Sequence, residues 1–346
     1  MADSLSDRER QVLEVVIETY VQTAEPAASR TIARRSGLGL SPASIRTTMS
    51  SLEEKGYLYH PHTSAGRIPT DLAYRVYVDS LMRPSRVAAE HAEQLHDQLS
   101  GERAAVEAIL ARAAQVLGVL TNELGVAVSP SLDDAVLERL ELVPVSSDRL
   151  LLVMTLQSGV VRTIFVEVPW AMAPEVVVQV TVVMNERLAG HTLREIRGTL
   201  PDRLRDAGAG PGSSELINIF IQEAEELFDV ARGVSSEQAV LLGSTQPLAV
   251  QPEFSTKEGL QGLMAVTERR DLLREAIQRR RRDGITITIG TEHQDTRLSP
   301  FTLVTSSYRS GPLSGVIGIL GPTRMPYDKV VALVDHTSRL VGDLMQ

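Results

Sequence analysis

The chain has 346 residues, 43% of them hydrophobic, and a formal net charge of −9 at pH 7. A chain of this length and composition is expected to fold into two or three domains with compact apolar cores. It has no cysteine, which excludes disulfides, iron–sulfur clusters and thiolate zinc sites and suits a reducing cytoplasm.

The amino terminus predicts no targeting segment. Residues 1–4 have no basic start and lead into no apolar core. The longest uncharged stretches of the chain fall short of the roughly 20 residues that span a bilayer. We therefore expect a cytoplasmic protein that is neither secreted nor embedded in a membrane.

The charge is divided unevenly along the chain. Residues 1–86 hold 11 Lys and Arg against 10 Asp and Glu, whereas the rest holds 24 against 34. Within residues 29–67 there are 6 basic and 2 acidic residues. Because DNA affinity depends on the field at the docking face, an acidic body behind a basic module is compatible with DNA binding. An ordinary solvated surface would give the same counts.

Two helices are predicted at the start of the chain. Ser6 and Glu9 form a capping box, and apolar residues follow at helical spacing. Ser29 is expected to cap a short second helix that runs through Arg35 and is stopped by Gly37. The tight connection that follows is typical of a helix-turn-helix.

A third helix has the features of a DNA-reading helix. Ser41 caps it and Pro42 begins it. Ile45, Met49 and Leu52 make one apolar stripe, and the opposite and flanking faces carry small or basic side chains. A helix that enters a major groove about 12 Å wide needs such a slim face, with donors and acceptors for base edges.

A short hairpin follows that helix. Residues 57–59 begin a strand, and residues 60–66 hold enough turn formers for a wing tip. Arg67, just past the tip, either contacts phosphate or a narrow minor groove, or only solvates the hairpin. The order helix, strand, turn, strand predicts a winged helix-turn-helix. The candidate DNA-binding residues are Ser29, Ser41, Ala43, Ser44, Arg46, Thr47, Ser50, His62, Ser64 and Arg67.

Helices and then strands are predicted beyond the hairpin. Residues 71–82 read as a helix that Pro84 ends. Residues 87–124 are rich in Ala, Glu and Leu and predict one long amphipathic helix or two, which join the DNA module to the body. From Val126 onward, short β-branched runs separated by turn residues indicate antiparallel strands.

The middle of the chain is predicted to be helical. Residues 176–188 and 215–231 read as helices around a Gly-rich break, which lacks the glycine spacing of a nucleotide loop and is interpreted as a flexible loop. The second helix has an apolar face that either packs within its own domain or supplies a two-fold dimer contact. That face consists of Leu216, Ile217, Phe220, Ile221, Ala224 and Leu227.

Strands return near the carboxyl terminus. A helix from Thr256 ends in four arginines, residues 279–282, which either complement the helix dipole as a solvated face or touch DNA. Residues 285–289 alternate as a strand, two further apolar runs follow, and residues 327–345 close the chain as a helix. This pattern suggests one sheet domain interrupted by an insertion, or two separate α+β domains.

Segments at both ends of the chain resemble one known family. SIRTTMSSLEEKGYLYHPHTSAGRIPT followed by DLAYRVYVD, together with YRSG and GVIGILGPTRMPYDKV near the end, resemble the heat-inducible transcription repressor HrcA family. That family usually has Asn where this chain has Thr47. Asn can read adenine with two hydrogen bonds and Thr cannot, so the base-reading role at this position is open.

The resemblance implies an α+β multidomain fold, with an N-terminal winged helix-turn-helix and a GAF-like antiparallel-sheet domain interrupted by an inserted dimerising domain. The expected parts are 1–84, the winged helix-turn-helix; 85–124, a helical linker; 125–185, the first part of the GAF-like domain; 186–254, the inserted dimerising domain; and 255–346, the second part of the GAF-like domain.

The resemblance also implies a function. It predicts a negative regulator of chaperone operons that binds double-stranded DNA at an inverted-repeat operator, CIRCE, as a homodimer. The chaperonin GroEL is the implied partner that supports its activity. We expect no cofactor, no metal and no catalysis.

An enzyme and a ligand-controlled regulator are the competing interpretations. Residues 292–295 contain three possible metal ligands, but adjacent loop residues point apart. No nucleophile elbow, P-loop or paired-carboxylate motif is present. The second alternative, a winged-helix regulator controlled by a small ligand in its GAF-like domain, lacks a convergent charged pocket in the sequence.

Overall fold

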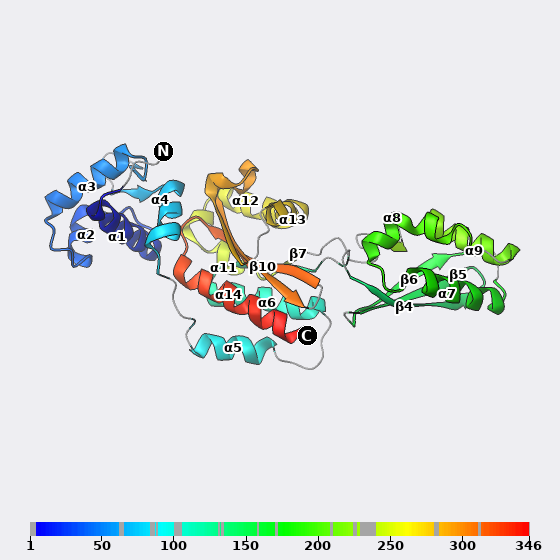
Figure 1. Ribbon diagram of the computed structural model, residues 1–346. Helices are drawn as coiled ribbons and strands as arrows, with labels where there is room; N and C mark the ends of the chain where they lie inside the picture. Colours follow the sequence, from blue (N-terminus) through cyan, green and yellow to red (C-terminus); the bar gives the residue numbers. More distant parts are fainter. Residues whose placement is uncertain are drawn as a thin grey trace. The chain divides into compact units, whose positions relative to one another are not determined.

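The computed structural model divides the chain into two compact units (Figure 1). It describes residues 5–61, 66–83, 87, 89–99, 106–130, 132, 135–157, 159–169, 172–207, 210–223, 227–228, 240–279, 284–310 and 313–345. The first unit comprises Met1–Ala127, Val240–Ser307 and Val316–Leu344, and the second comprises Val128–Ala239 and Tyr308–Gly315 with the last two residues.

The first unit begins with an N-terminal module of helices and a short hairpin. Its elements are α1 (Asp7–Thr23), α2 (Ser29–Arg35), α3 (Pro42–Glu54), β1 (Leu58–Tyr59), β2 (Ile68–Pro69) and α4 (Asp71–Val76), which a π-helical turn (Tyr77–Leu81) extends. β1 and β2 pair antiparallel. Ile45 and Leu52 are fully buried and Met49 is 3% exposed, which confirms the predicted apolar stripe.

The local helix signals are mostly confirmed. Ser6 and Glu9 form the predicted capping box, and the Ser41 hydroxyl accepts from the Ser44 amide at 3.1 Å. Ser29 differs, because Ala28 occupies the N-cap position and Ser29 is the first helical residue. The physical reason is that the Ala27 backbone pairs with that of Arg67, so the chain stays extended up to Ala28.

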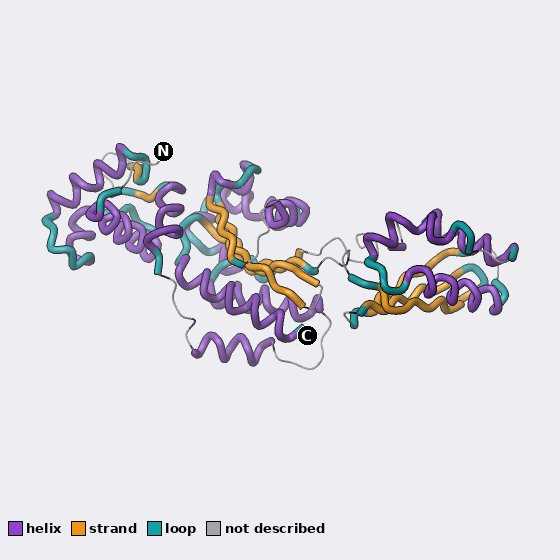
Figure 2. Tube along the Cα trace, viewed as in Figure 1, coloured by secondary structure: helices purple, strands orange, loops and turns teal. Residues whose placement is uncertain are grey.

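The rest of the first unit, which we call the body, is built on a five-stranded sheet in the order β7-β3-β10-β9-β8. In Figure 1, α6 and α14 lie along one side of this sheet and α12 and α13 along the other, and Figure 2 shows the same view with the strands in orange. The strands are β3 (Leu124–Val128), β7 (Val240–Leu242), β8 (Ile285–Ile289), β9 (Phe301–Ser310) and β10 (Leu313–Pro322). The helices are α5 (Ala89–Leu99), α6 (Val106–Thr121), α11 (Gln246–Ala249), α12 (Lys257–Glu268), α13 (Arg270–Arg279) and α14 (Tyr327–Leu344), with 3-10 turns η2 (Pro252–Phe254), η3 (Gly290–Glu292) and η4 (Thr296–Leu298).

The segment expected to be a helical linker belongs to the body. It forms α5 and α6, which pack against each other and against α14. Leu110, Ala113, Ala114 and Leu117 of α6 are fully buried. A helix with this much apolar surface gains stability by packing rather than by spanning solvent.

The second unit is a sheet with helices on one face. β4 (Leu137–Ser146), β5 (Arg149–Leu156) and β6 (Val161–Glu167) pair antiparallel in that order, and α7 (Pro174–Leu188), α8 (Leu193–Leu204) and α9 (Pro211–Gln222) accompany them. Alternate residues of β5, from Leu150 to Leu156, are buried and join the core shared with the helices.

This division differs from the predicted domain boundaries. Strands of 125–185 were expected to join the C-terminal sheet, but β4, β5 and β6 pair only with one another among the described strands. The second unit therefore starts at Val128, and residues 240–254 return to the first unit. Strand periodicity shows which face of a strand is buried but not which sheet the strand joins.

The apolar face of α9 packs inside its own unit. Leu216 and Phe220 of α9 are fully buried and Ile217 is 3% exposed, as is Leu227 beyond the end of α9, whereas Ala224 of the predicted face lies outside the described residues. All four belong to the core of that unit. Of the two interpretations that the sequence left open, the structure therefore favours internal packing.

None of the helices in the described part of the chain combines the length and the apolar character that a membrane span requires.

Candidate nucleic-acid interface

The solvent side of α3, which we call the operator face, presents the predicted small and basic residues. Ala43, Arg46 and Thr47 are exposed, whereas Ser44 and Ser50 are half-buried. Arg46 makes no hydrogen bond or ion pair with the described residues of the chain. Its guanidinium donors are therefore available to an external acceptor such as guanine or phosphate.

Thr47 has a restricted chemistry on this face. Its hydroxyl donates to the Ala43 carbonyl at 3.2 Å, the back-bonding usual for Thr within a helix. The hydroxyl hydrogen is thus used, and the side chain offers an acceptor oxygen and a methyl group. This set suits a thymine methyl rather than the paired donor and acceptor of adenine.

Glu9 anchors the opposite side of α3. Its carboxylate accepts from the Ser6 amide at 2.8 Å and from the Ser51 hydroxyl at 2.9 Å, and it pairs with Lys55 Nζ at 2.9 Å. The hydrogen bond from the Ser6 amide, followed by that from Lys55, lowers the pKa of Glu9 to about 2. Glu9 therefore joins the start of α1 to the end of α3 as a charged group.

Arg67 is not exposed as a side chain that contacts DNA from the wing would be. Its side chain is only 13% exposed and pairs with Glu53 at 2.9 Å. Its backbone N–H donates to the Ala27 carbonyl, and its own carbonyl accepts from the Ala27 N–H. A Cβ on the neighbouring Gly66 would lie 2.4 Å from the Ala27 carbonyl oxygen, so only glycine fits there. Arg67 thus holds the returning strand against α3, and His62 and Ser64 lie outside the described residues.

Three basic residues that the site prediction omitted lie on α2. Arg30, Arg34 and Arg35 are exposed. Lys55, another basic residue of this region, forms an ion pair with Glu9. The first helix of a helix-turn-helix crosses the phosphate backbone, where such side chains bind. The excess of basic residues in 29–67 was the sequence signal that could have identified them.

Two of the three possible metal ligands at 292–295 are bound to arginines. Glu292 binds Arg75 through both carboxylate oxygens at 2.7 Å. Asp295 binds Arg297 at 2.8 and 2.5 Å, and these bonds hold the pKa of its carboxyl well below its usual range. Among the described residues, no three His, Cys, Asp or Glu side chains are placed to hold a metal ion.

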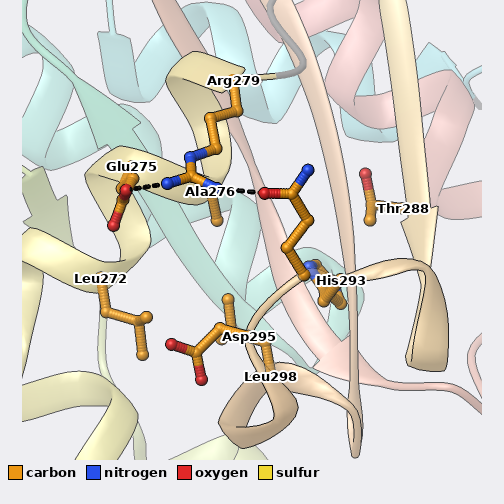
Figure 3. A pocket seen from close by; sticks show the side chains of 9 residues that line it. Leu272, Glu275, Ala276, Arg279, Thr288, His293, Asp295 and Leu298 are labelled. Carbon is orange, nitrogen blue, oxygen red and sulfur yellow. Dashed lines mark hydrogen bonds and ion pairs between the residues drawn. The ribbon is translucent and has the colours of Figure 1, made fainter.

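One cavity of about 310 Å³ lies in the body beside α13 (Figure 3). Arg279 spans it in Figure 3, bonded to both Glu275 and Gln294. Residues 280–282, the rest of the arginine run, lie outside the described part. The lining residues are Leu272, Glu275, Ala276, Arg279, Thr288, His293, Gln294, Asp295 and Leu298.

Comparison with known proteins gives consistent matches along the chain. The family model described as "HrcA protein C terminal domain" matches residues 107–331. The heat-inducible transcription repressor HrcA of Chlorobium phaeobacteroides (strain BS1) is 38% identical, covering 97% of each chain. The repressor of the same name from Chlorobaculum tepidum is 36% identical over 99% of this chain and 98% of its own.

A solved structure shares the fold. A crystal structure titled as that of a hypothetical protein at 2.2 Å resolution aligns with a TM-score of 0.62. It covers 99% of each chain at 24% sequence identity. The arrangement of helices and antiparallel sheets is therefore one that an experimental structure also contains.

Proposed function

The chain belongs to the HrcA family of heat-inducible transcription repressors, negative regulators of heat-shock transcription, and from this premise we propose how it binds its operator. The order of α1, α2, α3, β1 and β2 supports a winged helix-turn-helix. Its α3 enters the major groove of an inverted repeat, the CIRCE element of the family resemblance. The observation that carries this proposal is Arg46, which is exposed, has no partner among the described residues and lies opposite the buried stripe of α3.

The contacts divide into base reading and positioning. Arg46 binds a guanine edge, and Ala43 and Thr47 contact thymine methyl groups. Ser41, Ser44 and Ser50 add hydrogen bonds near the same groove. Arg30, Arg34 and Arg35 bind phosphates and supply the salt-dependent part of the affinity. Arg67 orients the wing from inside, so its loss would act through the wing's position.

A homodimer matches the symmetry of an inverted repeat. The second unit offers a surface for it, because the open face of its sheet presents exposed apolar side chains between the exposed ion pairs Arg139–Glu141 and Arg149–Glu167. Phe165 is 62% exposed and Val161 is 59% exposed on β6, and Val143 on β4 is 42% exposed. Leu151 pairs with both Phe165 and Val143, so these side chains form one continuous row. Two such faces bury each other in the dimer we propose.

Operator titrations and sedimentation of the full chain test the proposal. We expect the wild type to sediment as a dimer and to bind a two-half-site duplex at least about 100-fold more tightly than a one-half-site duplex. Phe165→Glu should give monomers and remove that preference. Val178→Glu, on an exposed position of α7, is the matched control. A monomeric wild type that binds both duplexes equally would contradict the proposal.

We propose that the chaperonin GroEL, which the family resemblance implies, controls the activity of the repressor. GroEL keeps the repressor folded, and heat diverts the chaperonin to other unfolded proteins. Adding GroEL and ATP to the refolding chain should raise the fraction of chains that bind the operator. If GroEL and ATP leave the fraction of operator-binding chains unchanged at every temperature, the proposed control by GroEL is wrong.

The cavity beside α13 supports a second candidate, a repressor controlled by a small ligand in a GAF-like body. Its volume of about 310 Å³ can hold a small polar molecule. It ranks second because Arg279, its main cation, is already bonded to Glu275 and Gln294. A small molecule that raises the melting temperature of the wild type but not of Ala276→Phe, which fills the cavity, would support this candidate.

A further inference from the structure

The segments that carry the family resemblance at opposite ends of the chain meet in the first unit. DLAYRVYVD forms α4 and the turn after it, and GPTRMPYDKV leads into α14. We infer that their contact, together with η2 and η3, fixes the orientation of the N-terminal module on the body and thereby sets the half-site spacing that the repressor accepts. This inference rests on the proposed dimeric repression, and we call the contact the docking contact.

Arg75 is the centre of the docking contact. Its Nε and one terminal nitrogen each donate to a different oxygen of Glu292 at 2.7 Å, and that nitrogen also donates to the Ile287 carbonyl at 2.7 Å. Its other terminal nitrogen donates to Asp79 at 3.1 Å. The bonds to Glu292 raise the pKa of Arg75 above its ordinary value. A bidentate pair fixes direction as well as distance.

Asp71 makes a second bond between module and body. Its carboxylate accepts from the Thr291 amide at 2.8 Å and from the Thr291 hydroxyl at 2.9 Å. Gly290 has φ +52°, and a Cβ there would lie 2.2 Å from an Asp71 oxygen. The body therefore provides a backbone concavity into which this carboxylate fits.

Arg324 binds the module from the other side. Its guanidinium donates to Glu253 at 2.5 and 3.0 Å and to the Val21 carbonyl at 2.8 Å. Val21 lies in the last turn of α1, which has no basic residue of its own. Arg324 thus supplies the cation that stabilises the carboxyl end of this helix, although it belongs to the body.

Aromatic packing fills the space between these polar groups. The rings of Tyr74 and Tyr327 lie 5.7 Å apart, and each residue is 1% exposed. The Tyr327 hydroxyl donates to the Thr323 carbonyl at 2.8 Å, which fixes its ring. An apolar centre flanked by bidentate ion pairs is the construction of a specific interface rather than of a chance contact.

The docking contact is rigidly connected to α3. Thr70 caps α4, and its hydroxyl also donates to the Gly56 carbonyl at 2.8 Å, immediately after α3. The Thr70 amide donates to the Tyr57 carbonyl at 3.0 Å. A rotation of α4 on the body would therefore turn the reading helix with it.

A fixed orientation has a consequence for operator choice. A dimer gains affinity from its second half-site only where the second module reaches it without strain. Modules held in one orientation favour one spacing, whereas freely swivelling modules accept several spacings with a lower peak affinity. Asp71, Arg75, Glu292 and Arg324 are thus positioning residues for DNA recognition.

The test compares Arg75→Ala and Arg324→Ala with the wild type on duplexes in which the two half-sites are moved apart in single base-pair steps. The wild type should bind the duplex with the best half-site spacing about 100-fold more tightly than a duplex whose spacing differs by half a helical turn. Each variant should reduce that preference to less than about tenfold, with affinity for a one-half-site duplex unchanged. Arg339→Ala, which removes an exposed ion pair with Asp335 on α14, is the matched control.

The orientation can also be measured directly. Because the chain has no cysteine, spin labels at Arg10→Cys on α1 and Glu268→Cys on α12 report one distance, provided that labelled chains are diluted with unlabelled ones. We expect a narrow distance distribution in the wild type and a broad one in the variants. Asp71→Asn keeps the side chain's size and provides a milder variant if an alanine variant melts below the assay temperature.

The outcomes separate the two levels of inference. A wild type that binds one-half-site and two-half-site duplexes equally would defeat the proposed dimeric repression. A wild type that prefers two half-sites but accepts every spacing alike would overturn only the role of the docking contact. A wild type with the preference, and folded variants that keep both the preference and the narrow distance distribution, would overturn the role of the docking contact alone.

Discussion

Two faces of the N-terminal module treat their charges in opposite ways. On the operator face, Arg46 is exposed and has no partner within the described chain. In the docking contact, Arg75 donates to two carboxylates and a carbonyl, and Asp71 accepts two hydrogen bonds. The difference teaches that the Arg46 guanidinium stays available to an external ligand, whereas the charges of Arg75 and Asp71 are satisfied within the molecule and stabilise it.

The largest effect should come from the core that supports both faces. Leu52 is fully buried beneath α3, so Leu52→Ala should destabilise the module by about 2–5 kcal/mol through lost burial and a cavity. Denaturation of the full chain followed by circular dichroism, with operator binding measured in parallel, checks this. Thr47→Ala on the exposed side is the control, and equal midpoints for the two variants would mean that the buried and operator faces are exchanged.

A buried carboxyl near the docking contact should make stability depend on pH. Glu123 is 2% exposed and accepts from Gln251 Nε2 at 3.0 Å, and burial raises its pKa to about 8 from 4.5. The folded chain keeps a proton that the unfolded chain releases between these values. This stabilisation is therefore complete below about pH 4.5 and is lost as the pH rises to about 8.

Replacing this carboxyl with an amide should remove the dependence. Glu123→Gln should be more stable than the wild type by up to about 5 kcal/mol at about pH 8.5, because the pKa rises from 4.5 to about 8 and each pKa unit corresponds to about 1.4 kcal/mol. Denaturant titrations across this range measure the effect, with the exposed Glu268→Gln as the control. Glu9, whose pKa is lowered to about 2, acts in the separate window below pH 4.5, where its stabilisation is lost as the pH falls. Parallel pH profiles for wild type and Glu123→Gln would refute the assignment.

Substitutions on the operator face should change DNA affinity and leave the stability of the fold unchanged. Arg46→Ala should cost about 1–3 kcal/mol of operator affinity and relax discrimination at one base pair, with an unchanged melting temperature. Arg34→Ala, on α2, should weaken all sequences alike and lower the salt dependence by about one counterion. If Arg46→Ala also weakens all sequences alike, Arg46 contacts phosphate.

The smallest effect concerns the position at which the chain departs from its family. Thr47→Asn should improve binding by about 1 kcal/mol to operators with adenine opposite this position, because the amide can bond to both adenine groups. Thymine at the same position should become less favourable. Binding to a pair of operators that differ only there measures the exchange, and an equal change for both would place residue 47 away from the bases.

The sequence predicted what depends on neighbouring residues. Ser41, Pro42 and Gly56 bound α3 through signals within a few residues of each helix end, and the stripe beginning at Ile45 follows from helical spacing. The positions of Arg67 and of the strands β4, β5 and β6 depend on partners far along the chain. Spacing carries no record of such partners, so it left open whether β4, β5 and β6 share a sheet with the C-terminal strands, and it did not show that Arg67 pairs with Glu53.

The bond between Arg324 and Val21 also has a consequence for the synthesis of each new chain. Its two residues are separated by 303 positions, and a ribosome that adds about 5–20 residues per second needs roughly 15–60 s to pass from one to the other. The N-terminal module emerges first and has its own core, so α3 can form while the body is still absent. Every newly made repressor therefore passes through a period in which its reading helix exists but has no fixed orientation, and termination before residue 324 would leave it permanently in that condition.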